Sequence, residues 1–287
     1  MENVSLNIHK EALTKDEFTK LSNSIFNICG INLPEVKKIL IEGRIRKRMI
    51  QLRIDTYSDY INYLFSIKGM EEEIIPLIDV ITTNKTDFFR ENQHFDYLTN
   101  SVLPEIIQNY EGNWKNKIFQ FWSAGCSTGE EPYTMAIVLS EFQNKNPGFQ
   151  FEIYASDIST DVLTKASLGI FDLEKIDVIP EQLKKKYLLR SKDPDKKVFR
   201  IVPELRNKVH FSRLNFMDDY YDIPENLNII FCRNVIIYFD RQTQEKVLTN
   251  LSRKLIKGGY LFIGHSETIM GMNIPLVRVA STIYQKI

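Results

Sequence analysis

The chain has 287 residues, 43% of them hydrophobic and 26% charged, as in an ordinary soluble globular protein with one large or two smaller domains. Lys and Arg equal Asp and Glu at 37 each, so the net charge implies no general attraction to nucleic acid or acidic membranes. Three widely separated cysteines indicate neither a disulfide framework nor a zinc cluster. No secretory signal or bilayer-length apolar run is present, so we expect a cytoplasmic protein without membrane insertion or metal.

Residues 1–81 are predicted to form a small helical domain. Thr14 and Glu17 have the spacing of a capping box, and apolar residues follow at helical intervals. Further helices are expected at about 34–51, 56–66 and 71–81.

Residues 82–287 are predicted to form a doubly wound α/β domain, because strand and helix patterns alternate from about residue 117 onward. The expected strands are 118–122, 150–155, 208–211, 227–232 and 259–264, followed by a pair at 276–280 and 282–286. Gly258 and Gly259 are expected to form the turn between a helix at about 241–256 and the next strand. Residues 170–207 interrupt the alternation and are predicted to be a small inserted β unit.

The segment Phe119–Tyr133 is typical of a buried strand, a glycine turn and the start of a helix. Gly125 and Gly129 let the backbone turn tightly and approach a ligand. The next apolar run ends at Asp157, which places an acid at the tip of the neighbouring strand. This layout predicts a nucleoside site in which the acid accepts hydrogen bonds from the ribose hydroxyls.

The same loop indicates which nucleoside binds. Ser127 stands where a dinucleotide fingerprint has its middle glycine, and Glu130 and Glu131 would repel a pyrophosphate. S-adenosylmethionine, which carries a sulfonium and an ammonium and no phosphate, fits better. The alternative is that the two glutamates only complement the helix dipole.

Separated motifs in a specific order resemble the CheR family of chemotaxis receptor methyltransferases. The resemblance implies a helical N-terminal domain followed by a Rossmann-like class I methyltransferase domain with a small antiparallel insertion. It also implies methyl transfer from S-adenosylmethionine to receptor glutamates, with S-adenosylhomocysteine as the product, by a protein-glutamate O-methyltransferase. The matching segments are Thr82–Arg90, Ser123–Tyr133, Ala155–Asp157, Asn215–Phe216, Phe231–Asp240 and Gly264–Glu267.

Carried over to this sequence, the resemblance implies a set of cofactor-binding residues and two catalytic ones. Arg90 and Tyr238 are expected to orient the reacting groups. Whether Glu130 or Glu131 faces the cofactor stays open, with Glu130 favoured, and His265 is expected to be structural. The cofactor-binding set is Asn84, Thr86, Arg90, Glu130, Asp157, Asn215, Phe216, Arg233 and Asn234.

Receptor docking is predicted for the helical domain, because residues 37–53 hold seven basic residues and one acidic residue. Arg44, Arg48 and Arg53 are expected to meet the glutamate-rich receptor helices that the resemblance implies. The alternative is a solvated basic face without a partner.

The inserted unit is not expected to bind a receptor C-terminal tether pentapeptide. Family members that use such a tether resemble one another in a glycine-spaced turn, and residues 189–197 contain no glycine. Pro194 removes a backbone donor, and lysines blunt sheet edges. The protein is expected to be a monomer.

Three other functions are weighed against this one. They are a methyltransferase with an RNA or small-molecule substrate, a module that senses S-adenosylmethionine without catalysis, and a nicotinamide oxidoreductase. Arg90, Asn234 and Tyr238 argue against the second, and the loop without its middle glycine argues against the third.

Overall fold

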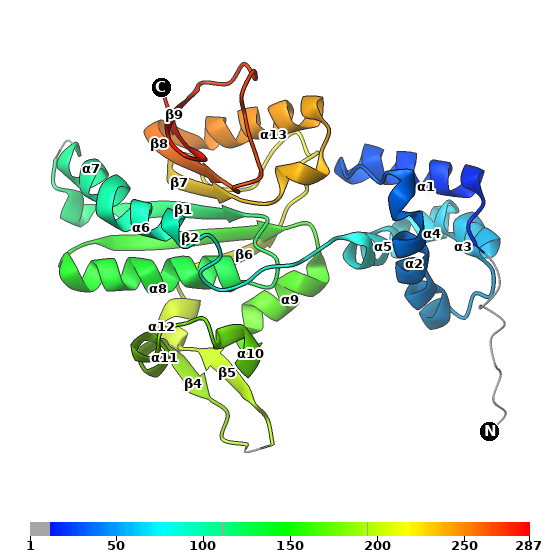
Figure 1. The fold of residues 1–287 in the computed structure, drawn as a ribbon, viewed down its shortest axis with the longest axis horizontal. Helices are drawn as coiled ribbons and strands as arrows, with labels where there is room; N and C mark the ends of the chain where they lie inside the picture. Colours follow the sequence, from blue (N-terminus) through cyan, green and yellow to red (C-terminus); the bar gives the residue numbers. More distant parts are fainter. Residues whose placement is uncertain (1–11, 111, 194) are drawn as a thin grey trace. The chain divides into compact units, whose positions relative to one another are not determined.

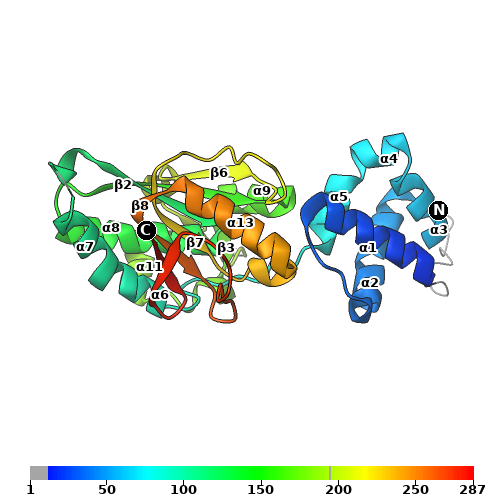
Figure 2. The same ribbon diagram turned by 90° about the horizontal axis from the view of Figure 1, so that it is seen from above.

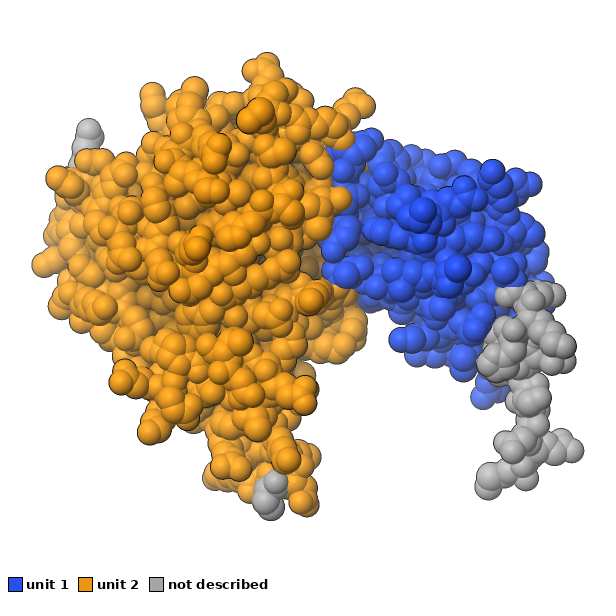
Figure 3. Space-filling model, viewed as in Figure 1, with its two compact units in different colours: residues 1–83, 238–240 blue, residues 84–237, 241–287 orange. Residues whose placement is uncertain are grey.

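The computed structural model describes residues 12–110, 112–193 and 195–287, which form two compact units. The first unit covers the chain up to Thr83 and the segment Tyr238–Asp240, and the second covers Asn84–Ile237 and Arg241–Ile287 (Figure 3). Among the described residues, no helix is both long enough and apolar enough to cross a membrane.

The first unit is all-helical, as the sequence predicts. The Thr14 capping box is present, with the Glu17 N–H donating to Thr14 Oγ1 and Glu17 Oε2 accepting from the Thr14 N–H. The predicted helix at 71–81 is in fact two helices that meet at Glu73. The elements are α1 (Lys15–Cys29), the 3₁₀ helix η1 (Glu35–Lys37), α2 (Lys38–Leu52), α3 (Tyr57–Leu64), α4 (Ile67–Glu72) and α5 (Ile74–Ile81).

Two of the predicted docking arginines on α2 make contacts inside this unit. Arg48 forms two hydrogen bonds with the buried carboxylate of Glu73, at 2.8 and 2.7 Å. Arg44 donates to the carbonyls of Ile81 and Thr82, which lie at the C-terminal end of α5. Both side chains therefore help to hold α2 against α5.

The second unit is built on a seven-stranded sheet with the order β6-β2-β1-β7-β8-β10-β9 (Figure 1). The first five strands in this order run parallel, and β10 and β9 are antiparallel to their neighbours. The chain leaves β1 toward one edge and β7 toward the other, so the topological switch lies between these two strands. The strands are β1 (Ile118–Ala124), β2 (Gln150–Asp157), β6 (Val209–Arg213), β7 (Leu227–Cys232), β8 (Leu255–Ile263), β9 (Leu276–Ala280) and β10 (Ile283–Lys286).

All six residues of β7 are buried. This is expected for a central strand of a parallel sheet with helices on both faces. In Figure 1, α8 (Glu130–Lys145) and α13 (Arg241–Lys254) lie on opposite sides of the strands, and Figure 2 shows α13 running along the sheet from above. The other helical elements of the second unit outside the insertion are α6 (Gln93–Tyr97), the π-helix η2 (Leu98–Val102), α7 (Leu103–Gln108), η3 (Trp114–Asn116) and α9 (Thr160–Leu168). The 3₁₀ helix η4 (Ile236–Tyr238) begins in the second unit and ends at Tyr238, which is grouped with the first.

The predicted insertion is a three-stranded antiparallel sheet with the order β3-β5-β4. It projects away from the main sheet in Figure 1. Pro194, which the tether prediction uses, lies outside the described residues. The insertion contains β3 (Ile170–Asp172), α10 (Leu173–Ile176), α11 (Glu181–Tyr187), β4 (Leu188–Arg190), β5 (Val198–Ile201) and α12 (Pro203–Arg206).

The expected turn at Gly258 is wrong. Strand β8 begins at Leu255, directly after α13, and Gly258 lies inside it with a φ of 78°. The register with β7 shifts between Leu227 and Ile229, so Gly258 sits in a bulge. A glycine with positive φ suits a bulge as well as a turn, and the sequence alone does not separate the two.

Candidate functional site

Polar residues from three parallel strands meet at the topological switch. The loop Gly125–Gly129 follows β1, Asp157 is the last residue of β2, and Arg233 and Asn234 follow β7. The carboxyl ends of parallel strands share one edge, so the sheet brings these groups to one crevice, where ligands bind in open α/β sheets.

The loop after β1 is fixed by close packing and by backbone hydrogen bonds. Gly125 has a φ of 89°, and a Cβ on it would lie 2.4 Å from Cγ2 of Val235, so only glycine fits. Ser127 adopts a left-handed conformation, and its N–H donates to Asp157 Oδ2 at 2.8 Å. The other Asp157 oxygen accepts from the Ser159 N–H at 3.0 Å. Backbone donors thus hold the Asp157 carboxylate at the mouth of the loop.

The segment before α6 is tied to this loop. The Ser127 hydroxyl donates to the Asn84 carbonyl at 3.0 Å, and the Phe89 N–H donates to Thr134 Oγ1 on α8 at 3.2 Å. Phe89 and Glu91 both have positive φ, at 55° and 53°. Left-handed residues other than glycine are strained, and such strain is found mainly at functional sites.

Arg233 is buried and joins this segment to α8. Its Nε donates to Glu131 Oε2 at 2.7 Å, and its Nη1 donates to the Arg90 carbonyl at 2.7 Å. Glu131 Oε1 accepts from the Ser123 hydroxyl at 2.7 Å. Both oxygens of Glu131 are therefore engaged inside the domain, and this glutamate positions Arg233.

Glu130 makes a different set of contacts. Thr128 Oγ1 donates to its Oε2 at 2.6 Å, and the Lys175 ammonium lies 3.4 Å from its Oε1. Lys175, from α10 of the insertion, also donates to the Thr86 carbonyl at 2.5 Å and to Asp87 Oδ1 at 3.1 Å. Burial raises the pKa of Glu130, opposed by the Thr128 hydrogen bond and the charge of Lys175. Lys175 is not among the residues predicted from the sequence, since nothing in its local pattern marks it.

Asn215 and Phe216 lie just after β6 and are buried. Asn215 Oδ1 accepts from the Met217 N–H at 3.1 Å, and the Phe216 carbonyl accepts from the Tyr221 hydroxyl at 2.8 Å. The Leu214 N–H donates to the Asp157 carbonyl at 2.9 Å, which keeps this turn beside the end of β2.

The turn after β7 is organised by Glu267. Its two oxygens accept the N–H groups of Asn234, Val235 and Ile236, at 3.0, 2.8 and 2.9 Å, and the N–H of Gly264 at 2.5 Å. Asn234 has a φ of 59°. Burial raises the pKa of Glu267, although these N–H groups favour its charged form. The motif Gly264–Glu267 is the sequence signal for this role, although no function was predicted for Glu267 itself.

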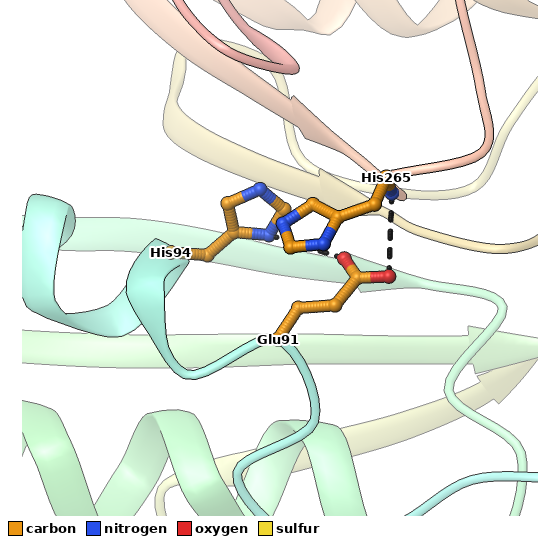
Figure 4. Close-up of side chains that lie close together, drawn as sticks. All are labelled: Glu91, His94 and His265. Atoms are coloured by element: carbon orange, nitrogen blue, oxygen red, sulfur yellow. Dashed lines mark hydrogen bonds and ion pairs between the residues drawn. The ribbon is translucent and has the colours of Figure 1, made fainter.

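Glu91, His94 and His265 lie close together (Figure 4). The His265 N–H donates to Glu91 Oε1 at 3.2 Å, and His94 Nδ1 lies 3.4 Å from Glu91 Oε2. Burial alone would raise the pKa of Glu91, but the His265 N–H and the charge of Arg233 leave it below its ordinary value. Residues of these types can hold a metal ion.

The position of Arg233 argues against a metal at this cluster. Its Nη1 lies 3.2 Å from His94 Nδ1 and 3.6 Å from Glu91 Oε2, so it donates to the lone pair that a metal would need. The Nε2–H of His94 then points to Thr282 Oγ1 at 2.8 Å. Burial and the Arg233 charge lower the pKa of His94 to about 4. The geometry is that of a hydrogen-bonded network around a neutral histidine.

Two of the predicted site residues fall in different compact units. Tyr238 is grouped with the helical unit, whereas Arg90 belongs to the second unit, so their joint catalytic role stays a prediction. Arg53 is exposed at the C-terminal end of α2. Cys126 lies in the glycine loop, and burial raises the pKa of its thiol well above the ordinary value, which fits a structural role.

Comparison with known proteins assigns both parts of the chain. The family described as CheR methyltransferase, SAM binding domain, matches residues 84–285, and the CheR methyltransferase all-alpha domain matches residues 16–82. The chain is similar to a chemotaxis protein methyltransferase from Borreliella burgdorferi, at 42% identity over 98% of this chain and 97% of the relative. A chemotaxis protein methyltransferase from Salmonella typhimurium is 34% identical over 95% of this chain and 91% of its own length. The chain therefore belongs to the CheR family of chemotaxis methyltransferases.

Proposed function

We propose that this methyltransferase transfers the methyl group of S-adenosylmethionine to glutamate side chains of chemoreceptors, forming glutamate methyl esters and S-adenosylhomocysteine. The observation that carries the proposal is the crevice in which the loop Gly125–Gly129 is bonded to Asp157. Arg233, with its hydrogen bonds to Glu131 and to the Arg90 carbonyl, lies at the same edge of the sheet. The similarity to chemotaxis protein methyltransferases supports chemoreceptors as the substrate class.

The chemistry of the crevice fits S-adenosylmethionine. Asp157 offers carboxylate lone pairs for the ribose hydroxyls, and Gly125 permits close approach of the backbone. Glu130 adds a negative charge near the loop, which suits a ligand with a sulfonium and an ammonium. Asn84, Thr86, Arg90, Asn215, Phe216, Arg233 and Asn234 complete the proposed cofactor-binding set.

When bound, S-adenosylmethionine supplies an electrophilic methyl group. The substrate carboxylate is ionised at neutral pH, so the chain need not provide a general base. Its residues have to orient the two groups and exclude water from the carboxylate. We assign orientation to Arg90, whose planar guanidinium can hold a carboxylate by two hydrogen bonds, and to Tyr238.

Isotope transfer tests the reaction. The protein is incubated with receptor-containing membranes and methyl-labelled cofactor, and the products are treated with base. Release of labelled methanol is expected, because esters hydrolyse in base and N-methyl groups do not. Label that stays on the protein, or that appears in RNA or small molecules, would assign a different substrate class.

Kinetics test the two orienting residues. Arg90→Ala and Tyr238→Phe are expected to lower kcat by about tenfold or more. Normal kcat and KM in both variants would remove these residues from the mechanism. Activity is expected to be flat from about pH 6 to about pH 8, since the substrate carboxylate stays ionised there. A change in activity within that pH range would indicate that a general base takes part.

The proposal extends to partners and place. The helical unit docks on glutamate-rich receptor helices, and the enzyme acts as a cytoplasmic monomer without a metal. A receptor C-terminal pentapeptide is expected to show no binding in calorimetry. A Kd in the low micromolar range, about −8 kcal/mol, would contradict that part of the proposal.

A further inference from the structure

One carboxylate oxygen of Glu91 holds the ends of two neighbouring strands. Glu91 Oε1 accepts from the side-chain Nδ2 of Asn234, which follows β7, at 3.3 Å. The same oxygen accepts from the N–H of His265, which follows β8, at 3.2 Å (Figure 4). Glu91 therefore fixes a side chain at one strand end by reference to the backbone at the next.

The carboxylate of Glu91 is itself held in one orientation. Its Oε2 is buried and faces Nη1 of Arg233 at 3.6 Å and Nδ1 of His94 at 3.4 Å. The Glu91 backbone adopts a left-handed conformation, with a φ of 53°. The pKa of Glu91 lies below its ordinary value, because the His265 N–H and the Arg233 charge outweigh burial. An ionised carboxylate only accepts hydrogen bonds, so Glu91 can engage only the donor side of Asn234.

This partner decides which way the Asn234 amide faces. An asparagine side chain carries a donor, Nδ2, and an acceptor, Oδ1, on two separate branches. Glu91 takes the donor branch, and Gly264 packs against it, since a Cβ on Gly264 would lie 2.5 Å from Asn234 Nδ2. The acceptor branch is left over, and among the described residues no group donates a hydrogen bond to Oδ1.

The order of the strands places this amide near one end of the proposed cofactor. Along the edge β6-β2-β1-β7, Asn215 follows β6, Asp157 ends β2, the glycine loop follows β1 and Asn234 follows β7. With the ribose at Asp157 and the adenine toward Asn215, the methionine part extends across the loop toward Asn234. That part carries an ammonium group, which offers three N–H donors and needs acceptors.

We propose that Glu91 is a positioning residue for the cofactor: it turns the Asn234 amide so that Oδ1 accepts a hydrogen bond from the ammonium of S-adenosylmethionine. This inference rests on the proposed function, from which it takes the identity of the cofactor. A hydrogen bond to a charged group contributes more than one between neutral groups, so the orientation of a single amide has a measurable effect.

Ligands that differ in the methionine part test the proposal, by calorimetry on the full chain. Glu91→Ala is expected to weaken S-adenosylmethionine binding by about tenfold. S-adenosylhomocysteine keeps the ammonium and should lose affinity equally. Binding of 5′-methylthioadenosine, which keeps the adenosine and lacks the amino acid, should be unchanged. Glu91→Gln retains an oxygen for Asn234 Nδ2 and should recover most of the affinity.

A second variant and a matched control accompany Glu91→Ala. Gly264→Ala pushes a methyl group against the Asn234 amide without changing any charge, and it should cause the same ligand-selective loss. Glu152→Ala is the control, because its carboxylate also pairs with a histidine and a cation, His210 at 2.6 Å and Lys208 at 3.7 Å. Glu152 lies near the start of β2, away from the crevice, so all three affinities should stay unchanged.

The pattern across the three ligands decides the outcome. Equal weakening of S-adenosylmethionine and 5′-methylthioadenosine in both Glu91→Ala and Gly264→Ala would show a general loss of the crevice and overturn the inference. Unchanged affinity for S-adenosylhomocysteine would overturn it as well. Methyl transfer to receptors is scored separately, so ligand-selective binding without methyl transfer would refute the proposed reaction and leave the role of Glu91 standing.

Discussion

The Ser127 N–H donates to Asp157 Oδ2 at 2.8 Å, and this bond joins the loop after β1 to the end of β2. The Ser159 N–H holds the second oxygen of the same carboxylate. Two backbone donors therefore fix the orientation of Asp157 before any ligand binds. A group held in this way has little orientational freedom to lose on binding.

Asp157→Ala is expected to weaken S-adenosylmethionine binding by about ten- to a hundredfold, which corresponds to about 1.4–2.7 kcal/mol. The variant loses the ribose acceptor and leaves the Ser127 N–H without its partner. Calorimetry with S-adenosylmethionine measures the change. Asp161→Ala is the control, because Asp161 pairs with Lys165 on the surface of α9 at 2.6 Å. Equal affinities in the two variants would rule out a ribose contact by Asp157.

Lys175→Met is expected to raise the Kd for S-adenosylmethionine severalfold, although Lys175 belongs to the insertion. Its ammonium holds the Thr86 carbonyl and lies 3.4 Å from the buried Glu130 carboxylate. Without that charge the pKa of Glu130 rises further, so the affinity of the variant should fall as the pH is lowered toward 5. Lys165→Met, on an exposed surface pair, serves as the control. A Kd that matches the unchanged protein at every pH would show that the insertion does not support the site.

Arg48→Met is expected to destabilise the helical unit by about 3 kcal/mol, because it leaves the buried Glu73 carboxylate without its cation. Adding Glu73→Gln should recover most of the loss, since the amide oxygen can still accept from the Tyr60 hydroxyl, which lies 2.9 Å from Glu73 Oε1. Urea unfolding monitors both variants. If Arg48→Met costs no more than Lys68→Met, which breaks an exposed pair, the Arg48 contact contributes nothing to stability.

The stability of the second unit is expected to fall as the pH drops from about 6.5 to about 4. The pKa of His94 is lowered to about 4 from 6.5, so in this range the unfolded chain binds a proton that the folded chain refuses. Stability is therefore complete above the unfolded pKa, and about 2–3 kcal/mol is lost by pH 4. Glu91, Arg233 and His265 are the charged or titratable groups that face the ring.

Thermal unfolding of the unchanged protein and of His94→Gln, across this pH range, isolates the histidine. Glu130 and Glu267 have raised pKa values, so the folded state takes up their protons before the unfolded state does, and they add stability as the pH falls. This contribution is the same in both proteins and cancels in the comparison. The difference between the two curves should shrink as the pH falls. Parallel curves would mean that folding does not lower the pKa of His94.

Local patterns in the sequence predict the layout of the fold well. The capping box at Thr14, the alternation of strands and helices, and the antiparallel insertion are all present in the structure. These features depend on residues near one another in the chain. The sequence does not predict the break between α4 and α5 at Glu73. The buried carboxylate of this residue is held by Arg48 and by Tyr60, which lie elsewhere in the chain.

The contacts that organise the site are less visible in the sequence. Arg233 bonds to Glu131, 102 residues earlier, and Lys175 reaches Thr86, 89 residues earlier. Such partners become neighbours only through the sheet topology. The sequence likewise does not show that Arg44 and Arg48 on α2 make hydrogen bonds within the helical unit. Periodicity identifies the faces of a helix, but packing decides which face lies inside.

The support of the crevice by Glu267 and Thr282 has a consequence for synthesis on the ribosome. Glu267 shapes the turn at Asn234, and Thr282 holds the ring of His94, 188 residues earlier in the chain. The sheet strands β1, β2 and β7 leave the ribosome well before these two residues do. A nascent chain can therefore build the centre of the sheet while its crevice is still incomplete, and it should gain full cofactor affinity only after Thr282 has emerged.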